Sequence, residues 1–222
     1  MNMTKILATA AAVALLPIAG SAATLSLTGG TTGSIPSNFG NLRDVNGSVA
    51  IPTDLSAPIT VFDADDAAGT TGLFVSSNDK VRVTLTYVGY EAANSNTASS
   101  LAAGPASFSN TTSAFGDTIV FDQMGGSGTL VDLIFSTLRI NTGSTCSISN
   151  GDTFGEACQI GFSQIFNGGN STYAMFGDGL GDSDLDDIVF RVDVSEVPVP
   201  AAGFLLVGGL GAMAALRRRK KA

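Results

Sequence analysis

One segment of this chain alternates strictly between apolar and polar side chains, and this alternation restricts the fold more than any other feature. Between residues 80 and 88, every second residue is apolar, from Val81 to Tyr87. Successive side chains of a β-strand point to opposite faces, so a period of two predicts a strand with one buried face. Helical periodicity is almost absent between Leu25 and Glu196. The body of the chain is therefore predicted to be all-β.

Similar short apolar runs, bounded by Gly, Asn, Asp and Ser, predict further strands. They lie near residues 24–27, 48–51, 59–62, 72–75, 118–121, 129–141, 159–166, 172–176 and 187–194. Nine or ten short antiparallel strands predict a β-sandwich, most often of the jelly-roll type. Residues 91–113 are rich in Ala, Ser, Asn and Thr and carry little periodicity. We expect this region to be a long surface excursion, either a tolerated insertion or a functional loop.

The N-terminus has the features of a secretory signal peptide. Lys5 precedes an apolar stretch over residues 6–19, which small residues at 20–23 follow. This order predicts a signal peptide over residues 1–22, cut by signal peptidase after Ala22 or Ala23. The body is then a single domain of residues 23–196, which is long enough to bury a full core.

The C-terminus combines a proline pair, a short uncharged run and a basic end. Residues 197–201 read Val197-Pro198-Val199-Pro200-Ala201, and five cations occupy residues 217–221. The prolines exclude helix before residue 201. A helix over residues 201–216 is about 24 Å long, against about 30 Å for a bilayer core, so it spans only marginally. The cations should stay cytoplasmic, which places the body outside. A plain membrane anchor is the alternative.

This tail resembles the C-terminal sorting signals of the PEP-CTERM superfamily, in particular the variant with the motif V-P-L-P-A. The chain departs from that motif only at Val199, where the family has leucine. The resemblance covers residues 197–222. It implies that an exosortase-type protease cuts near the motif. The protein would then pass from a transient inner-membrane anchor to the cell surface or extracellular matrix of a Gram-negative bacterium.

Charge and cysteine content narrow the possible partners. All nineteen acidic residues lie in the body but only five of the eleven basic ones do, which gives a formal body charge of −14. Such a surface repels nucleic acid, so nucleic-acid binding is excluded, and cations or neutral glycans are favoured.

Cys146 and Cys158 are the two cysteines of an exported chain, and a disulfide is expected. A reactive or metal-binding thiol pair is the alternative.

The composition argues against catalysis. The chain has no histidine, which removes Ser-His-Asp and Cys-His mechanisms and histidine-ligated zinc. A glycosidase needs only two carboxyl groups, yet the chain has no Trp, three Tyr and three Glu. We therefore expect a protein that is not an enzyme.

A cluster of aspartates stands between residues 177 and 187. Repulsion among these carboxylates is relieved by a hard cation such as Ca²⁺, which takes six to eight oxygen ligands. The expected metal ligands are Asp178, Asp182, Asp184, Asp186 and Asp187. The spacing fits neither an EF-hand nor a tandem calcium repeat, and the residues after the cluster alternate as a strand. A solvated acidic loop is the alternative.

The acidic cluster and the strand after it are similar to the C-terminal region of DUF4114-like domains, which occur in many exported proteins with such tails. Upstream, Gly89-Tyr90-Glu91-Ala92 resembles a G-x-E-A element of that group, which leads to an asparagine, here Asn94 or Asn96. The group commonly has an aromatic residue between the acids, where this chain has Leu185. The resemblance implies a fold and a Ca²⁺ site but no reaction.

These observations predict a non-catalytic surface or matrix protein that resides in or on extracellular polysaccharide. Jelly-roll sandwiches commonly combine Ca²⁺ with glycan recognition, so a Ca²⁺-dependent carbohydrate-binding module is the first alternative. The absence of Trp weakens it, because sugars usually stack on exposed aromatics. A glycosidase is the second alternative.

Overall fold

The computed structural model describes residues 22–37, 39–62, 68–138, 143–152, 158–178 and 184–197. These residues are all-β, and their one helical turn is the 3₁₀ segment η1 (Asn167–Gly169). No helix among them is long and apolar enough to cross a membrane. The predicted signal peptide up to residue 21, the membrane helix over 201–216 and the basic end lie outside the described residues.

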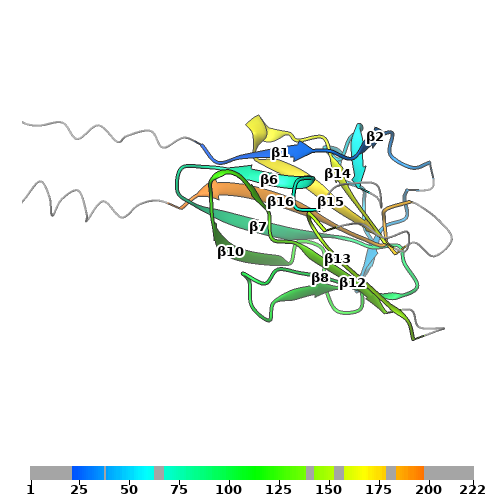
Figure 1. Cartoon of the computed structure of the whole chain (residues 1–222). Helices are drawn as coiled ribbons and strands as arrows, with labels where there is room; N and C mark the ends of the chain where they lie inside the picture. The colour runs from blue at the N-terminus through cyan, green and yellow to red at the C-terminus, as the bar shows by residue number, and fades with distance from the viewer. Residues whose placement is uncertain are drawn as a thin grey trace, which may run out of the picture.

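Seven strands form the largest sheet, which is antiparallel throughout (Figure 1). In spatial order they are β10 (Thr118–Met124), β7 (Lys80–Gly89), β16 (Ile188–Glu196), β15 (Ser171–Gly177), β14 (Gln159–Ser163), β5 (Ile59–Phe62) and β2 (Thr31–Gly33). The alternation that predicted β7 is confirmed, because its residues from Val81 to Tyr87 bury every second side chain fully.

Three smaller antiparallel sheets complete the described fold. One contains β1 (Thr24–Thr28), β6 (Gly72–Ser76) and β11 (Ser127–Leu130). Another contains β13 (Thr145–Ser149), β12 (Ile134–Leu138), β8 (Ser95–Ser99) and β9 (Ser107–Ser109), and a short hairpin pairs β3 (Arg43–Asp44) with β4 (Gly47–Ser48). The predicted all-β class with antiparallel sheets is confirmed.

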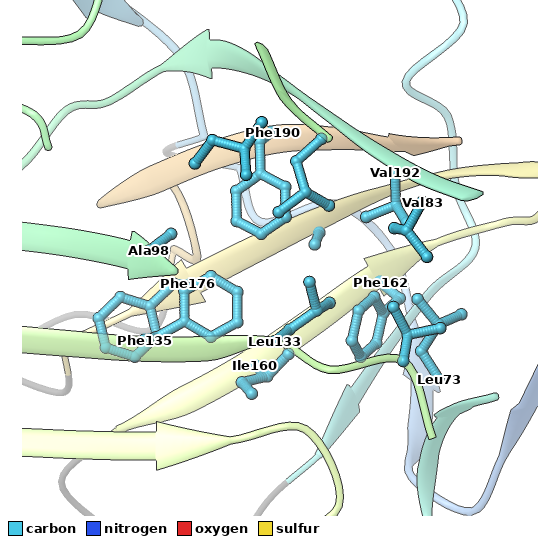
Figure 2. Close-up of a cluster of buried hydrophobic side chains, with 14 of the residues drawn as sticks. Leu73, Val83, Ala98, Leu133, Phe135, Ile160, Phe162, Phe176, Phe190 and Val192 are labelled. Atoms are coloured by element: carbon cyan, nitrogen blue, oxygen red, sulfur yellow. The ribbon is translucent and has the colours of Figure 1, made fainter. Parts of the chain in front are cut away.

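The main core fills the space between the seven-stranded sheet and the two sheets that pack against it (Figure 2). Phe135 of β12 stacks on Phe176 of β15 with ring centroids 4.9 Å apart, and it lies 5.4 Å from the ring of Phe190 in β16. All three side chains are fully buried. The arrangement is therefore sandwich-like, with aromatic contacts joining its layers.

A second apolar cluster includes Met175 and Val189, which alternate in their strands with core residues such as Phe176 and Phe190. Leu42 and Leu55, from the chain between β2 and β5, join this cluster. The seven-stranded sheet is thus buried on both faces near the start of β16. This explains why Ile188, Val189 and Phe190 form a continuous buried run instead of alternating.

The expectation of a surface excursion over residues 91–113 is wrong. The region contains β8 and β9, and it places Ala98 and Phe108 in the main core. The inward positions of β8 are Asn96 and Ala98, one polar and one small, so the strand has no apolar alternation to reveal it. Pairing with β12, and not the local pattern, accounts for this strand.

Several predicted boundaries also differ. The predicted strand 129–141 is two strands, β11 and β12, which pair in different sheets. The strand predicted at 48–51 is wrong, because only Ser48 of that range pairs, within the β3–β4 hairpin. β13 was not predicted, since its outward positions are Ser and Thr and it has one apolar core residue, Ile148.

Cys146 and Cys158 form the predicted disulfide. Cys146 lies on β13, and Cys158 directly precedes β14, with their Cα atoms 6.4 Å apart. The bond therefore connects the four-stranded sheet to the seven-stranded sheet at the edge of the main core.

Reduction of this bond should lower the free energy of unfolding by up to about 3 kcal/mol, because the reduced unfolded chain regains the freedom of the closed loop. Urea unfolding with and without reductant measures the difference. Non-reducing peptide mapping of the untreated protein should yield one linked pair of peptides. Two alkylatable thiols in the folded, untreated protein would contradict the bond.

Candidate cation site

The described aspartates of the acidic cluster flank the connection between β15 and β16. Asp178 directly follows β15, while Asp184, Asp186 and Asp187 precede β16. Asp182 lies outside the described residues. The end of β15 and the start of β16 lie at the end of the molecule opposite the start of β1 and the end of β16, on the right in Figure 1.

The structure divides these aspartates into two groups. Asp184 and Asp186 come together with Glu91, and the three residues each offer a carboxylate oxygen within 4.8 Å of the others. Asp178 and Asp187 form a neighbouring pair, in which the Asp178 amide donates a hydrogen bond to Asp187 Oδ2 at 2.6 Å. All four aspartates are buried. We call Glu91, Asp184 and Asp186 the carboxylate triad.

Asp186 is the most enclosed member of the triad, with no exposed surface. Its Oδ2 accepts a hydrogen bond from the Gly40 amide at 3.1 Å. Its Oδ1 is also buried and has no hydrogen-bond partner among the described residues. Buried polar atoms are nearly always satisfied in folded proteins, so an orphaned carboxylate oxygen requires an explanation.

Burial raises the pKa of Asp186 to about 7, against its ordinary value near 4. The hydrogen bond from Gly40 opposes this rise, while repulsion by Asp184, a side-chain hydrogen bond with Asp184 and repulsion by Glu91 add to it. The environment therefore disfavours the ionised form of the Asp186 carboxyl group unless a positive charge compensates it.

Backbone contacts hold the triad in place. The Glu91 amide donates to the Asp186 carbonyl at 2.8 Å, and Arg43 and Tyr90 exchange two hydrogen bonds of 2.9 Å. A Cβ atom at Gly89 would lie 3.0 Å from the Arg43 carbonyl oxygen, so glycine permits this close approach. The end of β7, the segment around residue 40 and the entrance to β16 therefore meet at the triad.

Leu185 separates the two aspartates of the triad and anchors them to the core. Its φ of 62° is unusual for a residue with a side chain. The side chain is 1 % exposed and joins the second apolar cluster. A Cβ at Gly161 would approach Leu185 Cδ1 to 2.7 Å, so β14 leaves a space that the leucine fills. An apolar anchor is thus present where the resembled group commonly has an aromatic.

Both asparagines named from the sequence lie at the acidic residues. Asn94 donates to Asp178 Oδ2 at 2.7 Å, and Asn96 donates to the Asp187 carbonyl at 3.4 Å. Asn110 fixes both, since its side chain accepts from the Asn96 amide and donates to the Asn94 carbonyl. The neighbouring pair is therefore held by β8 and the turn after β9.

Glu91 was not among the predicted ligands. It is far along the chain from the aspartates, and sequence spacing alone gives no reason to group them. The one sequence signal was its place in the G-x-E-A element, which the resemblance associated with the same group of proteins as the acidic cluster. The register of β7 against β16 brings the two elements together.

The predicted sorting motif begins where the described chain ends. The Val197 amide donates to the Lys80 carbonyl at 3.1 Å and continues the pairing of β16 with β7. Pro198, Val199, Pro200 and Ala201 lie outside the described residues.

Comparison of the chain with family models, with curated proteins and with solved structures finds no match. The three carboxylates provide hard oxygen ligands. Because Asp184 and Asp186 are buried, a large substrate would not reach them.

Replacing Leu185 with alanine should lower the free energy of unfolding by about 2–5 kcal/mol, because it empties a buried space beneath the triad. The matched control is Leu101→Ala. Leu101 is 79 % exposed, so this change should stay within about 0.5 kcal/mol. Chemical denaturation of the two variants gives the comparison. Equal small effects would show that Leu185 does not anchor the loop.

Proposed function

We propose that this chain is a non-catalytic protein of the bacterial cell surface or extracellular matrix, exported and sorted through its two ends. The signal segment would direct export and be removed by signal peptidase. The tail over residues 197–222 would hold the body at the inner membrane until an exosortase-type enzyme cuts near the motif at 197–201. Extracellular polysaccharide is the expected surrounding.

The observation that carries this proposal is the position of the two ends of the body. β1 begins and β16 ends at the same end of the molecule (Figure 1). β16 pairs with β7 as far as Glu196, so the body extends up to the residue before the motif. A membrane-tethered body of this form keeps the tail accessible to a protease and directs the triad away from the membrane.

Two further observations support a role without catalysis. The chain has no histidine. A glycosidase needs both of its carboxyl groups in contact with the sugar, whereas Asp186 is fully buried and Asp184 is 5 % exposed. Release of reducing sugar from matrix polysaccharide by the purified protein would contradict this part of the proposal.

We further propose that the sandwich has jelly-roll connectivity. Support comes from consecutive strands that change sheet, since β11 pairs with β6 while β12 pairs with β8 and β13. The chain thus passes between layers several times, as the chain of a jelly roll does, and does not complete one sheet before it begins the next.

A carbohydrate-binding module is the second candidate, and one hollow favours it. The four-stranded sheet has a cavity of about 360 Å³, without charged residues in its lining. The lining residues are Ser95, Thr97, Ser136, Thr137, Leu138, Thr145, Cys146 and Ser147. Hydroxyl groups of this kind suit a neutral, hydroxyl-rich ligand. Tyr87 and Tyr173 are buried, which argues against recognition by stacking on these rings.

The sorting proposal predicts the mass of the mature protein. Protein recovered from the cell surface should lack the first 22 or 23 residues and everything beyond about Ala201. Intact-mass spectrometry makes the measurement. Retention of Arg217 to Lys221 in the surface form would favour a plain membrane anchor.

The carbohydrate candidate predicts binding of neutral glycans on an array. Ser136→Lys would fill the hollow with a long cation and should abolish binding. Thr118→Lys adds the same charge to β10 of the other large sheet and should leave binding unchanged. If the unaltered protein binds no glycan, the surface protein without carbohydrate recognition is the better description.

A further inference from the structure

We propose that the carboxylate triad is a binding site for one divalent cation, Ca²⁺, held directly by Glu91, Asp184 and Asp186. This inference is independent of the sorting proposal, since it depends only on the described body. It differs from the grouping expected from the sequence, because it adds Glu91 and makes Asp178 and Asp187 a supporting pair.

One carboxylate oxygen of Asp186 is orphaned. Its Oδ1 is buried without a hydrogen-bond partner, while the carboxylate belongs to a cluster whose oxygens lie within 4.8 Å of one another. A buried acceptor whose side chain belongs to a group of three carboxylates lacks a positive charge nearby and not simply a hydrogen bond. A cation between the three carboxylates supplies that charge.

Hydrogen bonds already position two of the three ligands. The Gly40 amide engages Asp186 Oδ2 and leaves Oδ1 for the cation. The hydrogen bond from the Glu91 amide to the Asp186 carbonyl brings Glu91 alongside the aspartates. These hydrogen bonds therefore hold Glu91 and Asp186 together through the backbone.

The chemistry of the three ligands indicates the identity of the ion. All three ligands are carboxylates, no histidine exists in the chain, and both cysteines are in the disulfide, so softer metals such as Zn²⁺ have no preferred ligands. Ca²⁺ binds oxygen at 2.3–2.6 Å, so ligands on opposite sides of the ion are about 4.6–5.2 Å apart. The triad oxygens lie within 4.8 Å of one another, close enough for one ion to contact all three. Mg²⁺ forms shorter bonds of about 2.0–2.1 Å and demands near-ideal octahedral geometry.

The bound ion would join three parts of the fold. Glu91 follows β7, Asp184 and Asp186 precede β16, and Gly40 belongs to the segment between β2 and β3. These groups are dispersed in the unfolded chain, so Ca²⁺ binds the folded state preferentially. Stability must then increase with the concentration of the ion.

The test is a titration of the chelator-treated protein with Ca²⁺, by calorimetry and by thermal unfolding. We expect one site per chain. At one hundred times the dissociation constant, the melting temperature should rise by about 5–11 °C for a domain of this size. Mg²⁺ at equal ionic strength is the control for simple screening of the acidic body, and it should give a smaller rise.

Variants assign the site. Glu91→Gln changes the one triad member that is not buried and should fold normally, yet it should weaken Ca²⁺ binding at least tenfold. The double variant Asp184→Asn with Asp186→Asn should lose the rise in melting temperature that is specific to Ca²⁺. It should keep the smaller rise that comes from ionic screening. Asp79→Asn removes one exposed charge in the turn between β6 and β7, at the opposite end, and should bind Ca²⁺ as the unaltered chain does.

The proposal is overturned if Ca²⁺ and Mg²⁺ give equal rises in melting temperature that the double variant does not change. It is also overturned if Glu91→Gln and Asp79→Asn bind Ca²⁺ equally well. Neither outcome affects the sorting proposal, which rests on the mass of the mature protein.

Discussion

The packing of Phe135 against Phe176 and Phe190 is the contact on which the rest of the structure depends. It joins the four-stranded sheet to the two strands that flank the acidic residues. Full burial of such a side chain contributes about 1.5–3 kcal/mol, so the three rings form a substantial part of the core. Asp178 lies two residues after Phe176, and Asp187 lies three residues before Phe190. The aromatic contacts therefore determine where the acidic residues lie.

Around the carboxylate triad, favourable apolar packing is set against the free-energy cost of burying charged groups. Leu185 and the neighbouring cluster draw the connection before β16 inward, and the adjacent aspartates are buried with it. Asn94, Asn96 and Gly40 satisfy some of their polar atoms by hydrogen bonds. The remaining unfavourable charge is concentrated at Asp186, where a cation would offset it.

The strands with apolar alternation or continuous apolar runs could be predicted from the sequence, and β7, β15 and β16 lie close to their expected positions. β8 and β13 could not be predicted, because their inward positions, which include Asn96, Ala98 and Ile148, show no apolar alternation in the sequence. Pairing with neighbouring strands, and not the local pattern, places these residues inward. The acidic segment could be singled out from the sequence, but the division of its described aspartates into two groups was not predicted. That division depends on the contact with Glu91, which only the register of distant strands creates.

The place of β16 inside the seven-stranded sheet has a mechanical consequence. If the proposed tail tethers the body beyond Val197, a pull on it acts along the axis of a strand that is paired on one side with β7 and on the other with β15. If the far end of the body is also held, the hydrogen bonds of both ladders bear the load together in shear and are not broken one after another. While so tethered, the body would resist extraction by flow or traction far better than one attached through an edge strand.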